Sequence, residues 1–180
     1  MKSLQGQLLL ASRRLLDPNF SRTVVLLVQH GEDGALGLVL NRPLDVTVKE
    51  ACEDAVESPC LVEDVLYQGG PCQAPQLMAL HTYSEAGEIE IIPGLFFSQR
   101  SDGLEQLLTR SETTAKFFVG YSGWSPGQLE KEMQTGSWLQ MPATEELVFD
   151  ESSLWSRLVT QITLGGKVDP RLIPEDPSVN

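Results

Sequence analysis

The sequence predicts an α+β fold with a curved, mostly antiparallel sheet, and three features of the chain predict it. Two apolar runs, residues 23–29 and 35–40, flank a turn that contains Asp33-Gly34. An Asp-Gly pair between such runs is typical of a β-hairpin, because the turn requires residues that tolerate positive φ. Helical patterns are scattered among later strand patterns. The order lacks the strict alternation of strand and helix that marks a doubly wound parallel sheet.

The first half of the chain predicts strands and one helix. Residues 7–11 read as the first strand, and Asn41-Arg42-Pro43 ends the second hairpin arm because Pro43 cannot donate to a ladder. A helix is expected over residues 47–57, where apolar residues recur every three or four positions and Thr47 with Glu50 forms a capping box. Further strands are expected at residues 65–68, 77–81, 88–91 and 95–98. In the strand at 88–91 both glutamates should point to water, which argues against a paired acid and base.

The second half predicts three helices and three strands. Asp102 should cap a helix that carries three leucines, and Ser125-Pro126 should begin another, with Gln128 completing a capping box and Gly136 ending it. A last helix is expected over residues 154–163, ending at Gly165-Gly166. Strands are expected at residues 115–121, 138–141 and 147–149.

Length and composition predict one domain over residues 1–168, followed by a Pro-rich tail at 169–180. The apolar stretch at residues 8–11 is interrupted by Arg13-Arg14 before it could serve as a signal-peptide core. The longest aliphatic run, residues 24–28, is too short to span a membrane. We therefore expect a cytoplasmic protein without a membrane partner.

The net charge bears on possible partners. Thirteen basic against 25 acidic side chains give a formal charge of -12, and residues 50–64 carry several acids and no base. Proteins that bind duplex DNA neutralise phosphates with clustered Lys and Arg. The charge therefore disfavours direct DNA binding.

Cofactor and metal motifs are not evident. The three cysteines, Cys52, Cys60 and Cys72, have no metal-ligand spacing, and buried free thiols are the simpler interpretation. The glycines at 34–37 lead into a strand, whereas a phosphate-binding glycine loop leads into a helix. We expect no cofactor and no metal.

A serine hydrolase motif is present only in part. The segment Gly120-Tyr121-Ser122-Gly123 lies between a strand and a helix, but Trp124 occupies the place of the second elbow glycine. Both histidines, His30 and His81, precede Ser122, so the hydrolase order of triad residues is not met. The motif therefore favours a structural role.

Polar, aromatic and glycine residues gather at the predicted strand ends, where loops on a rigid sheet carry most binding sites. Each also has a structural explanation: Asn41 suits a turn, the glycines supply positive φ, Gln128 caps a helix, and Trp124 suits a core. As a hypothesis, these segments converge to form one ligand-binding cleft. Its candidate residues are Arg22, Asn41, Arg42, Gly69, Gly70, His81, Tyr121, Trp124 and Gln128.

At these positions the chain resembles the AlgH family of small bacterial proteins, most of which have no assigned function. The resemblance spans about residues 6–165; Cys72 and Arg13-Arg14 depart from the more apolar residues usual there. It implies an α+β fold with a curved, partly barrel-like sheet and flanking helices. Some members are called transcriptional regulators, but this chain shows no helix-turn-helix, so we expect any regulation to be indirect. The most specific motifs are residues 17–22, 34–43, 67–71, 120–124, 127–129 and 136–138.

Three functions follow as hypotheses. The first, which we favour, is a regulatory or binding module for a small anionic ligand or a protein partner. In it Arg42 supplies the charge, Tyr121 and Trp124 stack on the ligand, and the backbone of Gly69 and Gly70 lines the floor.

The second hypothesis is an enzyme with hydrolase-like activity that uses His81 or Ser122. The third is a transcriptional regulator that contacts DNA, which the net charge disfavours. These three hypotheses make different demands on the fold, because each needs a different set of residues to meet.

Overall fold

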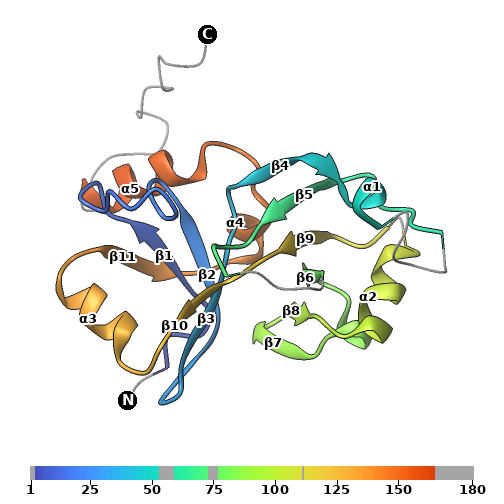
Figure 1. Cartoon of the computed structure of the whole chain (residues 1–180), viewed down its shortest axis with the longest axis horizontal. Coiled ribbons are helices and arrows are strands. Elements are labelled where there is room, and N and C mark those ends of the chain that lie inside the picture. Colours follow the sequence, from blue (N-terminus) through green and yellow to red (C-terminus); the bar gives the residue numbers. More distant parts are fainter. Residues whose placement is uncertain (1–2, 53–58, 73–76, 111, 165–180) are drawn as a thin grey trace, which may run out of the picture.

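The computed structural model describes residues 3–52, 59–72, 77–110 and 112–164. Its strands form two sheets that lie beside each other, and helices cover their outer sides (Figure 1). The predicted α+β class and the mostly antiparallel pairing are confirmed. The strands divide between two sheets, however, and neither sheet closes into a barrel within the described ranges.

The first sheet consists of β1 (Gln7–Ala11), β2 (Val24–Gly31), β3 (Gly34–Val39), β10 (Ser122–Trp124) and β11 (Trp138–Pro142). Its strand order is β10-β3-β2-β1-β11, and every neighbouring pair is antiparallel. β2 and β3 form the predicted hairpin, with Gly31 opposite Gly34. β10 is a strand that the sequence did not predict.

The second sheet consists of β4 (Pro43–Thr47), β5 (Val65–Gln68), β6 (Met78–His81), β7 (Ile89–Ile92), β8 (Leu95–Ser98) and β9 (Ala115–Val119). Its order is β4-β5-β9-β6-β8-β7. β5 and β9 run parallel, with Tyr67 opposite Phe118, and the other pairs are antiparallel. β4 was not predicted; as an edge strand it tolerates Pro43 at its first position, because the missing N–H is not needed there.

The helices are α1 (Val48–Cys52), α2 (Ser101–Leu108), α3 (Gln128–Gln134), α4 (Glu145–Phe149), α5 (Leu154–Thr163) and the short 3₁₀ helix η1 (Ser84–Ala86). The predicted capping box of α1 is confirmed. Glu50 N donates to Thr47 Oγ1 at 3.2 Å, and Thr47 N donates to Glu50 Oε2 at 2.8 Å. Residues 53–57 of the predicted helix lie outside the described residues, as do Gly165-Gly166 and the predicted tail.

The strand predicted at residues 147–149 was wrong, because these residues lie in α4. Thr144 Oγ1 caps that helix by accepting a hydrogen bond from Leu147 N at 3.3 Å, and Glu145 and Glu146 occupy its first turn. Negative charge in the first turn stabilises a helix through its dipole. The apolar run was too short for its periodicity to separate a strand from a helix.

Two helix beginnings also differ from the prediction. α2 begins at Ser101 with Arg100 as its N-cap, so Asp102 lies in the first turn and is not the cap. α3 begins at Gln128, after Gly127 in a left-handed conformation, and therefore starts later than Ser125-Pro126. The predicted capping interaction of the Gln128 side chain is present, since its Oε1 accepts a hydrogen bond from Ser125 N at 3.1 Å.

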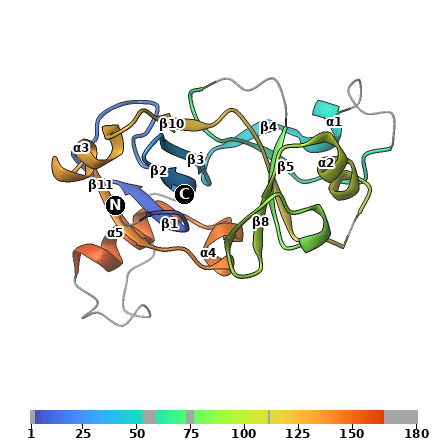
Figure 2. The ribbon, with the colours of Figure 1, turned by 90° about the horizontal axis from the view of Figure 1, so that it is seen from below.

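Three apolar clusters hold these layers together. The largest lies between the sheets and beneath α4 and α5, the second lies under α1 and α2, and the third lies under α3 (Figures 1 and 2). After Gln7, β1 is apolar because both of its faces are covered: Leu8 and Leu10 face the first cluster, while Leu9 and Ala11 face the third. No helix in the described ranges is long and apolar enough to cross a bilayer.

Candidate functional site

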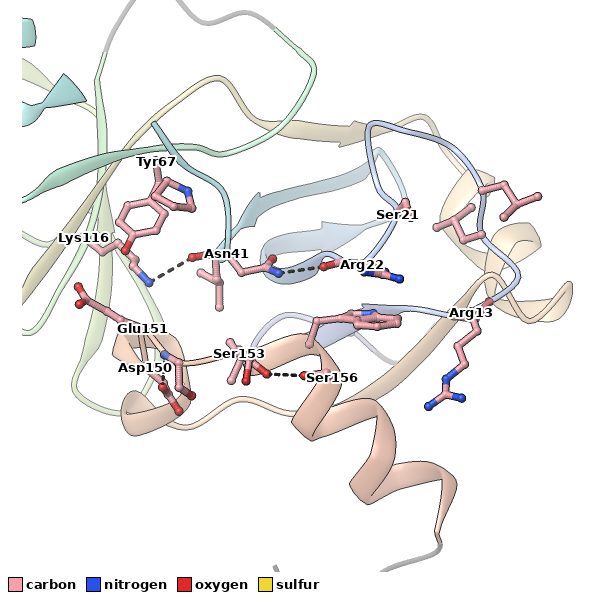
Figure 3. Close-up of a pocket in the computed structure, with 18 residues that line it drawn as sticks. Arg13, Ser21, Arg22, Asn41, Tyr67, Lys116, Asp150, Glu151, Ser153 and Ser156 are labelled. Atoms are coloured by element: carbon pink, nitrogen blue, oxygen red, sulfur yellow. Dashed lines mark hydrogen bonds between the residues drawn. The ribbon is translucent and has the colours of Figure 1, made fainter. Parts of the chain in front are cut away.

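A cleft of about 830 Å³ lies where the two sheets and α5 meet (Figure 3). Its wall includes Tyr67 from β5, Lys116 from β9 and residues 150–156. The rest comes from two further segments and consists of Ser12, Arg13, Leu15, Leu16, Ser21, Arg22, Leu40, Asn41 and Pro43. Ligand-binding clefts of small molecules typically have volumes of about 300–1,000 Å³. The volume therefore suits a small molecule, and the lining residues determine which chemistry it can hold.

Lys116 is the buried cation of this cleft. It shares one face of β9 with Phe118, since alternate residues of a strand point the same way, and only 5% of its surface is exposed. Its Nζ donates to two backbone oxygens, Leu40 O at 3.2 Å and Val148 O at 3.4 Å. The same nitrogen lies 4.3 Å from the centre of the Tyr67 ring, a cation–π distance.

Burial sets the protonation of this pair. Loss of water lowers the pKa of Lys116 to about 8, although the charges of Glu151 and Asp150 oppose that shift. Burial also raises the pKa of the Tyr67 hydroxyl. No carboxylate of the described chain lies within ion-pair distance of Lys116, and Asp150 is paired with Arg157. The groups that contact the ammonium directly are therefore neutral, and the charges of Glu151 and Asp150 act on it from farther away.

Arginines occupy the other end of the cleft (Figure 3). Arg22 has a φ of 58°, which is uncommon for a residue with a side chain, and its guanidinium carbon lies 5.8 Å from the centre of the Trp155 ring. Such backbone strain is found often at binding sites, where the surrounding structure maintains it. Arg13 lines the same end and is exposed.

Asn41 maintains the conformation of Arg22. Its Nδ2 donates to Arg22 O at 2.9 Å, and its Oδ1 accepts a hydrogen bond from Val24 N at 2.8 Å. Both halves of the amide are thus occupied by backbone groups. Asn41 lines the cleft as a support for Arg22, with its own polar atoms already satisfied.

Ser12 supplies an unused polar group. Its hydroxyl is buried, lines the cleft, and has no hydrogen-bond partner among the described residues. A buried hydroxyl without a partner costs free energy, and native proteins rarely leave one. Ser12 Oγ is therefore available to a ligand in the cleft.

The candidate residues named from the sequence do not all meet there. Arg22 and Asn41 line the cleft. Arg42 instead donates from Nη2 to Pro18 O at 2.8 Å, which fastens the loop between β1 and β2. The backbone of Gly69 is occupied within the sheet, since its N–H donates to Val119 O at 2.9 Å.

Gly70 serves a close crossing of two chain segments. Its φ is 155°, and a Cβ at this position would lie 2.3 Å from the carbonyl carbon of Tyr121. Cys72 and Tyr121 form an isolated backbone bridge beside it. This crossing explains the Gly69-Gly70 pair without a ligand.

Trp124, which was expected to stack on a ligand, has partners within the chain. Trp124 is buried, and its Nε1 donates to Glu132 Oε2 at 2.9 Å; Trp138 Nε1 donates to the same oxygen at 2.8 Å. Gln128 Nε2 donates to the other carboxylate oxygen at 2.9 Å. Three donors thus converge on Glu132 in the third apolar cluster. Trp124 and Gln128 do not line the cleft, and the expected convergence of their segment with Asn41 is absent from it.

His81 and Ser122 lie in the interior and have separate partners. His81 is fully buried in β6, its Nε2 lies 2.9 Å from Ser98 Oγ, and burial lowers its pKa to about 4. Ser122 is also fully buried, and its Oγ donates to Gly69 O at 3.2 Å. The two side chains do not form the nucleophile and base of a hydrolase.

Sequence reasoning missed three members of the site: Ser12, Lys116 and Trp155. A signal for Lys116 existed, since a lysine that alternates with Phe118 in a strand covered on both faces must point inward. Ser12 and Trp155 gave no such signal, because the cleft exists only once the loop after β1 meets α5.

Comparison with known proteins identifies relatives of this chain. The AlgH-like family model matches residues 8–167. A UPF0301 protein of Chlorobaculum tepidum is 42% identical over 86% of this chain and 84% of its own length. A UPF0301 protein of Myxococcus xanthus is 39% identical over 96% of each chain. Among solved structures, the solution structure of AlgH from Pseudomonas aeruginosa superposes with a TM-score of 0.74 at 30% identity, over 97% of this chain and 96% of that one.

A second solved structure shows the same fold at a greater distance in sequence. The crystal structure of a Corynebacterium diphtheriae protein has a TM-score of 0.71 at 22% identity, over 90% of this chain and 87% of that one. At this identity the likeness shows the fold alone.

Proposed function

This chain belongs to the AlgH-like family, and from its cleft we propose that it is a binding protein for a small anionic ligand. The observation that carries the proposal is the placement of Arg13, Arg22 and Lys116 around one cleft of a chain whose formal charge is -12. Cations gathered in a concave site raise the local concentration of anions even on an acidic protein.

Lys116 supports the proposal most directly. Its ammonium is buried without a carboxylate partner among the described residues, and a bound anion would supply the missing counter-charge. Arg22 would add a planar fork suited to a carboxylate or phosphate, and Ser12 a hydroxyl.

Other residues of the lining restrict the chemistry of the ligand further. Glu151 and Ser153 line the cleft and are exposed, and hydroxyl or amine groups of the ligand would match them. The ligand we propose is therefore a small molecule with one or two acidic groups and at least one hydrogen-bond donor. We place this function in the cytoplasm and expect any effect on transcription to act through the ligand or a protein partner, because the chain's charge opposes contact with DNA.

Isothermal titration calorimetry with citrate and with inorganic phosphate tests the proposal. Arg22→Asn is the informative variant, because Asn tolerates the left-handed backbone of that position. We expect it to weaken binding by about tenfold, the loss of one charge-assisted hydrogen bond.

The matched control is Arg14→Gln, which removes one positive charge from an exposed neighbour that does not line the cleft. Its affinity should equal that of the unmodified chain. Equal weakening by both variants would show that the affinity depends only on the net charge of the chain. Absence of binding to either anion would contradict the proposed function.

A further inference from the structure

The surroundings of the Lys116 amine in the cleft differ from those of the surface lysines. Lys116 Nζ is held by two carbonyl oxygens and by the face of Tyr67, whereas Lys49 and Lys131 are exposed. With a pKa of about 8, roughly a quarter of the Lys116 amines are neutral at pH 7.5. A neutral amine has a free lone pair, so Lys116 can act as a nucleophile near physiological pH.

The arginines of the cleft lie away from this amine. Figure 3 shows Lys116, Tyr67 and Glu151 at one end and Arg13 at the other, with Arg22 between them and nearer Arg13. A ligand that spans the cleft would place an acidic group against the guanidinium groups and a different group against Lys116.

We propose that Lys116 forms an imine with the aldehyde or ketone group of a small molecule whose phosphate or carboxylate lies against Arg22 and Arg13. The inference rests on the proposed function and adds the chemical class of the ligand: an anionic carbonyl compound. The bond would be reversible, which suits capture or sensing of such a compound.

The reaction balances without an oxidant or a reductant. The Nζ lone pair attacks the carbonyl carbon, and the carbonyl oxygen takes a proton, which gives a carbinolamine. The nitrogen loses one proton, the hydroxyl takes a second proton and leaves as water, and the C=N bond forms as a protonated imine, which releases its remaining N–H proton to give the neutral imine. Glu151, which lines the same end of the cleft, is placed to accept and return these protons.

Reductive trapping tests the inference on the full chain. The protein is mixed with pyridoxal 5′-phosphate, an aldehyde that carries a phosphate, and sodium borohydride reduces any imine to a stable amine. Mass spectrometry of the digested protein then locates the label. We expect Lys116 to be labelled at least tenfold faster than Lys49 and Lys131, and the preference to disappear in urea. Equal labelling of the three lysines in the native protein would overturn the inference.

The phosphate requirement is tested in parallel. Pyridoxal, which lacks the phosphate, should label Lys116 at least fivefold more slowly, and Arg22→Asn should reduce labelling by the phosphate-bearing probe to that level. Arg14→Gln should leave it unchanged. If the rate of Lys116 labelling depends neither on the phosphate of the probe nor on Arg22, the assignment of an anionic carbonyl ligand is wrong.

The two proposals fail in distinguishable ways. If citrate or phosphate binds with the expected dependence on Arg22 but Lys116 is not labelled, the imine is wrong and the anion-binding cleft stands. If neither binding nor labelling occurs, both proposals are wrong. Because the label is mapped on the unmodified chain, the result does not depend on whether a Lys116 variant folds.

Discussion

The side-chain amide of Asn41, just after β3, holds the backbone of Arg22 near the start of the neighbouring strand β2: Asn41 Nδ2 donates to Arg22 O at 2.9 Å. Its Oδ1 meanwhile accepts a hydrogen bond from Val24 N, so one side chain closes the end of the β2–β3 ladder and fixes a left-handed residue beside the cleft. A residue of the sequence motif thus acts on the ligand site through its neighbour.

Replacing Asn41 tests that support. Asn41→Ala leaves two backbone groups without their partners and should lower the free energy of unfolding by about 1–3 kcal/mol. It should also weaken citrate binding, because Arg22 is no longer held. Urea denaturation and calorimetry measure the two effects. Asn19→Ala, at an exposed loop position, is the control and should change stability by less than about 0.5 kcal/mol. Unchanged stability in Asn41→Ala would contradict the role given to the amide.

Glu132 should matter for stability and not for the ligand. Glu132→Gln replaces one carboxylate oxygen by an amide NH2 group, which cannot accept a hydrogen bond from an indole or from Gln128, so the variant should lose about 1–3 kcal/mol of stability. Tryptophan emission during urea denaturation reports this loss. The affinity for citrate should stay within about twofold, since Glu132 does not line the cleft. Glu105→Gln, exposed on α2, is the control; a large loss of citrate affinity in Glu132→Gln would instead link this network to the site.

The burial of Lys116 predicts a rise in stability with alkaline pH. Well below pH 8 both the folded and the unfolded chain carry the ammonium, so the full penalty of burying it is present. Between about pH 8 and 10.5 the folded chain has released the proton and the unfolded chain still holds it, so the penalty is relieved.

Lys116→Met isolates this effect, because every other ionisable group of the chain is the same in both proteins. From pH 7.5 to pH 10 the unmodified chain should gain about 2 kcal/mol of unfolding free energy relative to the variant. Urea titrations at the two pH values measure the difference. A constant difference would show that Lys116 keeps an ordinary pKa.

The burial of His81 predicts a loss of stability at acidic pH. Its folded-state pKa of about 4 lies below the ordinary 6.5, so the unfolded chain binds the proton first as pH falls through that window. Stability should therefore fall from pH 6.5 toward pH 4. Relative to His81→Gln, which stays neutral, the unmodified chain should lose up to about 2 kcal/mol between pH 7 and pH 4.5. Parallel profiles of the two proteins would contradict the burial of a neutral imidazole.

Much of the fold could be predicted from local patterns. The hairpin at Asp33-Gly34, the capping box of Thr47 and Glu50 and the final helix each depend on residues near one another in the chain, and each is confirmed. The division into two sheets depends on contacts between distant segments, such as the parallel pairing of β5 with β9. Local patterns do not specify such pairings, and short runs such as residues 147–149 are ambiguous even locally.

The site was predictable only in part for the same reason. Arg22 and Asn41 were named because they lie at strand ends, and both line the cleft. The aromatic motif around Trp124 was assigned to a ligand, but its partner Glu132 lies on a helix that the pattern did not connect with it. Lys116 is a single charge in a β-prone run, and the run shows that it points inward only once both faces of β9 are known to be covered.

Both proposals depend on the binding of anions in the cleft between Arg22 and Lys116. Chemical-shift mapping by nuclear magnetic resonance during a citrate titration tests it directly. We expect the largest shifts of backbone amides and of the indole N–H on residues that surround the cleft, namely Ser12, Ser21, Arg22, Lys116 and Trp155. Shifts centred on residues 121–128 instead, or no shifts at all, would contradict it.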